Sequence, residues 1–178
     1  GLDVLINNAA FTSELAKKNN IKFEDFDMDA WEHSIKINLT SVFFSCKEVL
    51  PYMKKKKCGK IINISSLYGH ISPNHSIYEG EDFNCMPSYT ASKSGVIGLT
   101  KWLATRYASL GIIINCISPG GVFNNQSKTF VKKYSKINPS GKMASQDDLL
   151  GLMNFLISDS SNYIVGQNIK IDGGHSIW

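Results

Sequence analysis

The sequence predicts an α/β fold with a parallel, doubly wound sheet, and three observations support this prediction. Short runs of aliphatic and β-branched residues alternate with longer segments of helical character along the 178 residues. The clearest run, 112–117, is apolar on both faces, as a strand buried between two helical layers should be. Small, polar or Pro-Gly turns follow the runs, and in a parallel sheet such turns share one edge. The length predicts a single domain over residues 1–178.

The expected strands are short aliphatic runs, which is the composition typical of buried strands. They are expected at Asp3–Asn7, Lys60–Ile64, Ile112–Ile117 and Asn168–Ile171. A polar loop that extends through Phe26 follows the first strand.

The first expected helix runs from Met28 to about Lys57. Asp27 is a suitable N-cap because its carboxylate can accept a hydrogen bond from the first helical turn. Pro51 is expected to bend or interrupt the last turns, since proline has no N–H to donate within a helix.

Two further helices are expected after the long loop 67–87. One runs over 88–110 and stops at Gly111, a residue that tolerates the left-handed conformation of a helix end. The other runs over 145–156, where a serine and Asp148 form a capping-box-like start.

Tyr89 and Lys93 form the most informative pair in the sequence. They are four residues apart in the 88–110 helix and therefore lie on one face. An ammonium beside a phenol favours the phenolate, so the pKa of Tyr89 is expected to fall from about 10 toward working pH. Such a tyrosine is a general acid/base that can exchange a proton with an alcohol or a carbonyl oxygen.

The order of the motifs around this pair resembles the short-chain dehydrogenase/reductase family, over nearly the whole chain. The motifs are Asn7-Asn8-Ala9-Ala10, Lys36-Ile37-Asn38-Leu39, Ser65-Ser66, Tyr89-Thr90-Ala91-Ser92-Lys93 and Ser118-Pro119-Gly120-Gly121-Val122. The resemblance implies a Rossmann-like fold and an oxidoreductase that interconverts a carbonyl and an alcohol by hydride transfer with NAD or NADP.

The resemblance also implies the site residues. The catalytic set is Asn38, Ser66, Tyr89 and Lys93. Ser66 would hold the substrate carbonyl, Tyr89 would exchange the proton, Lys93 would stabilise the tyrosinate and bind the cofactor ribose, and Asn38 would hold a water linked to Lys93. The cofactor-binding set is Asn8, Ala9, Tyr89, Lys93, Pro119, Gly120 and Val122.

Two of these assignments have alternatives. Ser65 competes with Ser66 for the substrate hydroxyl, although the register of the motif favours Ser66. Asn38 lies in the middle of a helix, where asparagine is unfavourable, so a functional role is preferred over simple solvent exposure.

The chain departs from the family pattern in three places. The sequence lacks the glycine-rich turn with which the family binds the cofactor pyrophosphate. We therefore expect the chain to be the C-terminal part of a longer reductase, with an incomplete sheet. We also expect the chain alone to bind a dinucleotide weakly. Ala10 replaces a usual glycine, which is unfavourable if that position needs positive φ or a close approach of the cofactor. Ser66 and Tyr89 are 23 positions apart, and the extra residues of 70–87 form either a substrate loop or a neutral surface insertion.

The substrate and the partners follow from further resemblances. The segment Ile77-Tyr78-Glu79-Gly80 resembles bacterial oxidoreductases encoded with flagellin-modification and nonulosonic-acid sugar genes, which implies a sugar-derived substrate. The alternative substrate is a 3-oxoacyl thioester or a simple ketone. A second class of function is a catalytically inactive fragment that acts through assembly. The small residues Ala91, Ser92, Gly95 and Gly98 lie on a helix that resembles the family's dimerising face, so a homodimer or homotetramer is expected.

Composition argues against other classes of protein. The net charge is +4, and the lysines at 54–57 are best explained as the solvated end of a helix, so no nucleic-acid partner is expected. No run is long enough to predict a membrane-spanning segment. The four cysteines and four histidines have no metal-ligand spacing, so no metal is expected and the cysteines indicate a reducing, cytoplasmic location.

Overall fold

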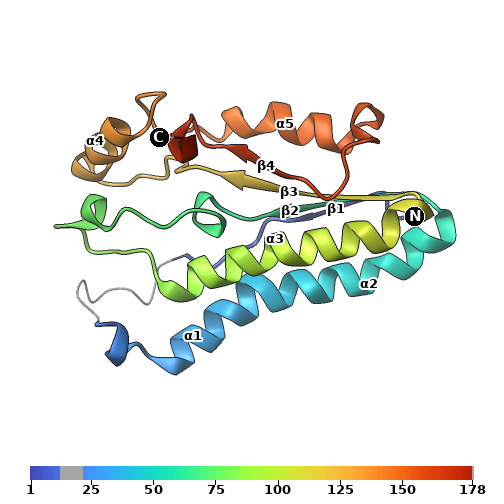
Figure 1. Ribbon diagram of the computed structural model, residues 1–178, viewed down its shortest axis with the longest axis horizontal. Helices are drawn as coiled ribbons and strands as arrows, with labels where there is room; N and C mark the ends of the chain where they lie inside the picture. The colour runs from blue at the N-terminus through green and yellow to red at the C-terminus, as the bar shows by residue number, and fades with distance from the viewer. Residues whose placement is uncertain (13–21, 178) are drawn as a thin grey trace.

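The computed structural model describes residues 1–12 and 22–177, which contain a four-stranded parallel sheet with helices on both faces (Figure 1). The strands are β1 (Val4–Asn7), β2 (Gly59–Ile64), β3 (Ile112–Pro119) and β4 (Asn168–Ile171), and they lie side by side in chain order. Each neighbouring pair is parallel, so the carboxyl ends of all the strands meet at one edge of the sheet. The predicted α/β fold with a parallel, doubly wound sheet is confirmed.

The helices form two layers around the sheet. Three pack on one face, namely α1 (Met28–Ile35), α2 (Ser41–Lys56) and α3 (Pro87–Tyr107), and α5 (Asp147–Ile157) packs on the other (Figure 1). A further helix, α4 (Lys128–Ile137), lies near the carboxyl-end edge of the sheet. No helix among the described residues is both long enough and apolar enough to cross a membrane.

The sheet is buried because its strands are apolar on both faces. Ile61 belongs to the cluster under α2 and α3, and its neighbour Ile62 belongs to the cluster under α5. Both side chains are at most 1% exposed. Burying a side chain of this size stabilises the fold by roughly 1.5–3 kcal/mol, so two successive residues of one strand hold both helical layers.

The first long helix differs from the prediction at two points. A π-helical turn, Lys36–Thr40, separates α1 from α2, and the sequence analysis did not anticipate it. Pro51 lies inside α2 and does not end it, because it is exposed and water can bond the carbonyl that it leaves without an N–H partner. Asp27 caps α1 as predicted, accepting a hydrogen bond from Asp29 N–H at 3.0 Å.

The other helix ends follow the sequence closely. Gly111 has φ 78° and ends the short turn after α3. Ser145 Oγ accepts a hydrogen bond from Asp148 N–H at 3.3 Å, and Asp148 Oδ2 accepts one from Ser145 N–H at 2.7 Å, which is the reciprocal pairing of a capping box. Helix α4 was not among the expected elements.

Candidate active site

A cavity of about 680 Å³ opens at the carboxyl-end edge of the sheet. It is lined by segments that follow β1, β2 and β3, by the first turns of α3 and by α4. The sequence-predicted residues that line it are Asn8, Ser66, Tyr89, Lys93, Pro119, Gly120 and Val122. Ala9 and Asn38 are not among the lining residues, so the structure brings together all but two of the predicted set.

Ser66 is the serine whose hydroxyl faces the reactive side chains. It follows β2 in extended conformation, and its Oγ accepts a hydrogen bond from Tyr68 N–H at 3.2 Å. Ser66 lines the same cavity as Tyr89 and lowers the pKa of that phenol. Ser65 is held differently, because its hydroxyl donates to the carbonyl of Lys93 at 2.7 Å. The geometry therefore favours Ser66 over Ser65 as the substrate-facing hydroxyl.

Tyr89 and Lys93 lie on one face of α3, one turn apart. Lys93 Nζ is 5.8 Å from the centroid of the Tyr89 ring, within the range of a cation–π contact. The same ammonium donates a hydrogen bond to the carbonyl of Ile64 at 2.9 Å. Lys93 is only 2% exposed, and burial lowers its pKa to about 8.

The expected direction of the Tyr89 pKa is wrong. Burial raises the pKa of the Tyr89 phenol, and the neighbouring Ser66 hydroxyl opposes that rise. Lys93 does not reverse it because its ammonium lies over the ring and bonds the carbonyl of Ile64. Removing the phenol from water is the larger effect, so the tyrosine is a protonated acid in this structure.

Asn38 supports the site from behind. Its side chain is fully buried, accepts a hydrogen bond from Phe11 N–H at 2.6 Å and donates one to the carbonyl of Phe11 at 2.9 Å. The amide also donates to Ser34 Oγ at 3.3 Å. The alternative of an exposed Asn38 is therefore wrong, and the side chain fixes the segment that carries Ala10 and Thr12 into the cavity wall.

The turn after β1 is not strained by its alanine. Among the described non-glycine residues, only Lys57 and Asn125 have positive φ, so Ala10 occupies a conformation that any residue adopts. A penalty from positive φ is therefore ruled out at Ala10, and a penalty from close approach of the cofactor stays a prediction.

A chain of buried amides stabilises the same edge from within the sheet. Asn7 Nδ2 donates to Asn63 Oδ1 at 2.8 Å, and Asn63 Nδ2 donates to Thr100 Oγ1 at 2.9 Å, which links β1, β2 and α3. The signal for this chain was present in the sequence as asparagines inside otherwise apolar strands.

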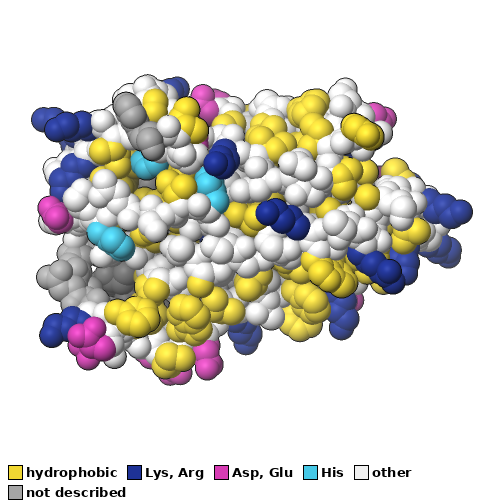
Figure 2. Space-filling model, in the orientation of Figure 1, with side chains coloured by type: hydrophobic (Ala, Val, Ile, Leu, Met, Phe, Trp, Pro, Cys, Tyr) yellow, Lys and Arg dark blue, Asp and Glu magenta, His cyan; other side chains and the backbone are white. Residues whose placement is uncertain are grey.

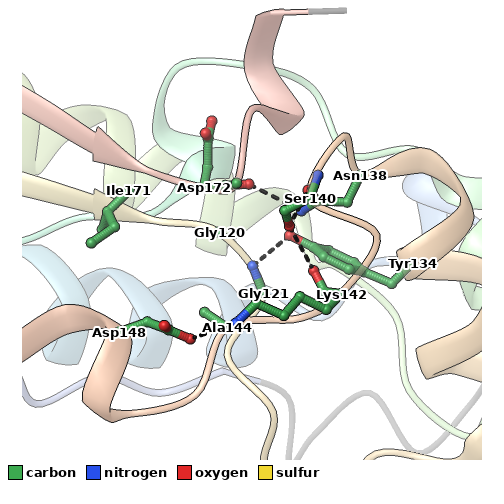
Figure 3. A pocket seen from close by; sticks show the side chains of 11 residues that line it. Gly120, Gly121, Tyr134, Asn138, Ser140, Lys142, Ala144, Asp148, Ile171 and Asp172 are labelled. Carbon is green, nitrogen blue, oxygen red and sulfur yellow. Dashed lines mark hydrogen bonds and ion pairs between the residues drawn. The ribbon is translucent and has the colours of Figure 1, made fainter.

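The turn after β3 is fixed by Tyr134 from α4, as Figure 3 shows. Gly121 N–H donates to Tyr134 Oη at 2.6 Å, and Gly120 N–H donates to the carbonyl of Ile171 at 3.0 Å. A Cβ atom on Gly121 would lie 2.8 Å from the Tyr134 ring, so only glycine permits this approach. The predicted Pro119–Gly120 turn is thus held by a residue that sequence reasoning missed.

Tyr134 is only 2% exposed, and its partners extend to the end of β4. Asn138 directly follows α4, and its side-chain amide donates to the carbonyl of Asp172 at 3.0 Å (Figure 3). Tyr134 also stacks on His175 with ring centroids 5.2 Å apart. Tyr134, Asn138 and Asp172 line a second, smaller cavity of about 220 Å³ beside the turn. The signal that could have found α4 was the apolar spacing of Phe130, Tyr134 and Ile137.

The loop 70–87 forms a wall of the main cavity. Tyr78, Phe83 and Cys85 line the cavity, and the first two also pack on Phe130 of α4. A neutral surface insertion would not contribute its aromatic side chains to a cavity shared with Tyr89, so the structure supports the alternative of a substrate loop.

Two histidines differ from the expectation that all four lie on the surface or in open loops. His70 and His175 are half-buried, and burial lowers the pKa of both. Within residues 1–12 and 22–177, no group of three His, Cys, Asp or Glu side chains is arranged to hold a metal ion.

Comparison with known proteins identifies relatives over almost the whole chain. Residues 1–176 match the family described as "Enoyl-(Acyl carrier protein) reductase". The 3-oxoacyl-[acyl-carrier-protein] reductase FabG of Buchnera aphidicola subsp. Schizaphis graminum is 37% identical, over 97% of this chain and 66% of the relative. The post-translational flagellin modification protein A of Campylobacter coli is 32% identical, over 79% of this chain and 55% of the relative.

Solved structures show the same fold. A short chain dehydrogenase from Leptospira borgpetersenii serovar Hardjo-bovis, solved with bound NAD+, superposes with a TM-score of 0.88 at 36% identity. The match covers 98% of this chain and 65% of that one. The chain therefore spans between 55% and 66% of the length of these relatives.

Proposed function

This chain belongs to the short-chain dehydrogenase/reductase family, and from that premise we propose that it carries the catalytic residues of an NAD(P)-dependent oxidoreductase that interconverts a carbonyl and an alcohol. The single observation that carries the proposal is that the Ser66 hydroxyl and the Tyr89 phenol lie in one cavity, with Lys93 one turn along α3. The flagellin-modification resemblance supports a sugar-derived substrate. The alternative is a 3-oxoacyl thioester, as the name of the first relative indicates for that protein.

The cavity fits a nicotinamide cofactor on its own geometry. The turn after β1 and the Pro119–Gly120 turn line the same space as Tyr89, and Gly120 presents no side chain to that space. Asn8, Lys93, Pro119, Gly120 and Val122 would hold the nicotinamide half of NAD or NADP, while Ala9 lies outside the lining. When bound, such a cofactor supplies or accepts the hydride.

The residues of the chain supply the proton and the orientation. The Ser66 hydroxyl donates a hydrogen bond to the substrate carbonyl oxygen and holds it beside the Tyr89 phenol. As the carbonyl carbon gains a hydride, Tyr89 transfers its phenolic proton to the oxygen, leaving a phenolate and an alcohol. Lys93 stabilises that phenolate through its positive charge. The raised pKa of Tyr89 suits the donor role, because the proton is in place at neutral pH.

The surface of α2 and α3 supports a homodimer or homotetramer. Large apolar side chains are exposed along these helices, including Phe43 at 49%, Phe44 at 52% and Trp102 at 63%. Figure 2 shows hydrophobic side chains gathered along this side of the molecule. Gly95 is not available for such a contact, since a Cβ there would already meet Leu39 at 2.7 Å. The four free cysteines support a reducing, cytoplasmic location.

The experiment that tests the function compares Tyr89→Phe with the natural protein in full length. Loss of the phenolic proton should lower turnover of a carbonyl with NADH or NADPH by about two to four orders of magnitude, with cofactor affinity nearly unchanged. The matched control is Tyr163→Phe, because Tyr163 is fully exposed and far from the cavity lining. Near-normal turnover by Tyr89→Phe would refute the mechanism. Absence of turnover by the natural protein itself would favour the alternative of an inactive chain that acts through assembly.

A further inference from the structure

One side of the main cavity is an aromatic wall, which consists of Tyr68, Tyr78, Phe83 and Phe130. Three of the rings contact one another, with centroid separations of 5.7 Å for Tyr78–Phe83 and 5.0 Å for Phe83–Phe130, and Tyr68 is joined to Tyr78 through their hydroxyls. They come from three segments of the chain, namely the turn after β2, the loop 70–87 and α4. A continuous aromatic surface built from separate segments indicates a binding surface for an apolar face of a ligand.

The loop and α4 hold the wall in place with charges that point away from it. The buried Glu81 carboxylate accepts hydrogen bonds from Ser127 Oγ at 2.7 and 2.8 Å, and Ser127 also caps α4. Lys133 Nζ donates to the carbonyls of Ser76 at 3.3 Å and Glu79 at 2.6 Å. Neither Glu81 nor Lys133 lines the cavity, so these charges fix the wall without charging its surface.

The polar atoms on the wall are neutral. Tyr78 Oη and Tyr68 Oη are hydrogen-bonded at 3.1 Å, and burial raises the pKa of both phenols. One phenol donates to the other, so the pair has one hydroxyl hydrogen left for a ligand. This pair can bind a hydroxyl or an ether oxygen of a substrate, but it supplies no opposite charge to an ion.

The only full charge in the described lining lies at the reacting end. Lys93 bonds the carbonyl of Ile64 and stands beside Tyr89, rather than among the rings of the aromatic wall. An ionised substituent placed against the wall would lose its hydration without gaining a partner of opposite charge.

We therefore propose that the substrate group that lies against the aromatic wall is uncharged and has an apolar face, as a sugar ring or an acyl chain has. The inference rests on the proposed function, because it describes the part of the substrate beyond the carbonyl that Tyr89 protonates. It excludes substrates that place a carboxylate or a phosphate against the wall.

The test compares a carboxylate with its methyl ester, which is neutral and larger by one methyl group. Binding of methyl levulinate and of levulinate to the full-length natural protein is measured by saturation-transfer NMR titration. The ester should bind at least roughly tenfold more tightly than the carboxylate, because burying an unpaired charge is unfavourable. Equal binding, tighter binding of levulinate, or no binding of either would overturn the inference.

A charged wall should change this preference. Phe83→Lys places an ammonium on the half-buried edge of the wall and should bring the affinity for levulinate up to or above that for the ester. The matched control, Phe83→Met, removes the ring without adding charge and should keep the preference of the natural protein. Far-UV circular dichroism verifies that both variants fold. An unchanged preference in Phe83→Lys would contradict the inference.

Turnover separates this inference from the proposed function and separates the two substrate sources. A methyl pyranoside that bears a ring ketone and a 3-oxoacyl thioester of N-acetylcysteamine are offered with NADH or NADPH, and the better substrate identifies a sugar ring or an acyl chain. If methyl levulinate binds preferentially but no carbonyl is reduced, the proposed function fails while the inference stands.

Discussion

The side-chain amide of Asn38 pairs with the backbone of Phe11 as a neighbouring strand would, accepting from its N–H at 2.6 Å and donating to its carbonyl at 2.9 Å. This pairing replaces backbone hydrogen bonds for a segment that continues beyond the end of β1. The π-helical turn Lys36–Thr40 carries the amide, so an irregular turn of one helix fixes the shape of the cavity edge.

Asn38→Asp should destabilise the fold and disturb the site. The carboxylate can still accept from Phe11 N–H, but it cannot donate to the carbonyl of Phe11 or to Ser34 Oγ. Leaving buried groups without partners costs about 1–3 kcal/mol, which urea denaturation would measure. The exposed Asn154→Ala is the control and should leave the unfolding free energy nearly unchanged. Equal stability of the two variants would show that the Phe11 pairing contributes little.

Lys93→Met should change how stability depends on pH. The pKa of Lys93 is about 8 in the folded protein and 10.5 for an ordinary lysine, so between those values the unfolded state binds more protons. The unfolding free energy of the natural protein therefore rises with pH across that window, because Lys93 loses its proton in the folded state. Below pH 8 the full cost of burying the charged ammonium is present. The variant should lack this contribution, which amounts to at most about 3 kcal/mol. Parallel curves of unfolding free energy against pH for the two proteins would contradict the buried charge.

Tyr134→Phe should weaken cofactor binding while leaving the proton donor, Tyr89, in place. The variant keeps the ring that packs on Gly121, but it leaves the N–H of Gly121 without its 2.6 Å partner. We expect the KM for the cofactor to rise about three- to thirtyfold, as loss of one buried hydrogen bond implies, with a smaller change in kcat. Tyr163→Phe is the control at an exposed position. A fall in kcat at unchanged cofactor KM would show that Tyr134 does not position the turn.

Trp102→Glu should prevent assembly through α2 and α3. Trp102 is 63% exposed, and a buried carboxylate in an apolar contact would be unfavourable. Light scattering with size exclusion should give a smaller particle for this variant than for the natural protein. Leu150→Glu changes an exposed side chain of α5 and tests whether the chain assembles through that face instead. If only Leu150→Glu reduces the size, the proposed interface is wrong.

The fold and part of the site were predictable from the sequence, for local reasons. Strands such as Ile112–Pro119 are marked by their own composition, and Gly111 ends its helical turn through its own φ angle. Ser66 could be placed at the site because parallel strands share a carboxyl-end edge. Tyr89 and Lys93 could be placed beside each other because a spacing of four residues puts them on one face of α3.

The remainder depended on contacts between distant segments. The π-helical turn at Asn38 follows from the position of Phe11, which is 27 residues away. The pKa of Tyr89 is set by burial, and burial depends on segments that pack over the helix rather than on the Lys93 spacing. Helix α4 was missed because its apolar residues are few and its stability comes from contacts with the loop 70–87.

The hydrogen bonds between Glu81 and Ser127 also constrain how this protein can be altered. Because the loop 70–87 and α4 hold each other, neither can be shortened or exchanged alone without exposing the rings that they share. A chimera that receives both segments together with the turn that carries Tyr68 should inherit the aromatic wall, whereas a graft of either segment alone should lose it. The two segments should therefore be exchanged as one unit, although 40 or more residues of sequence separate them.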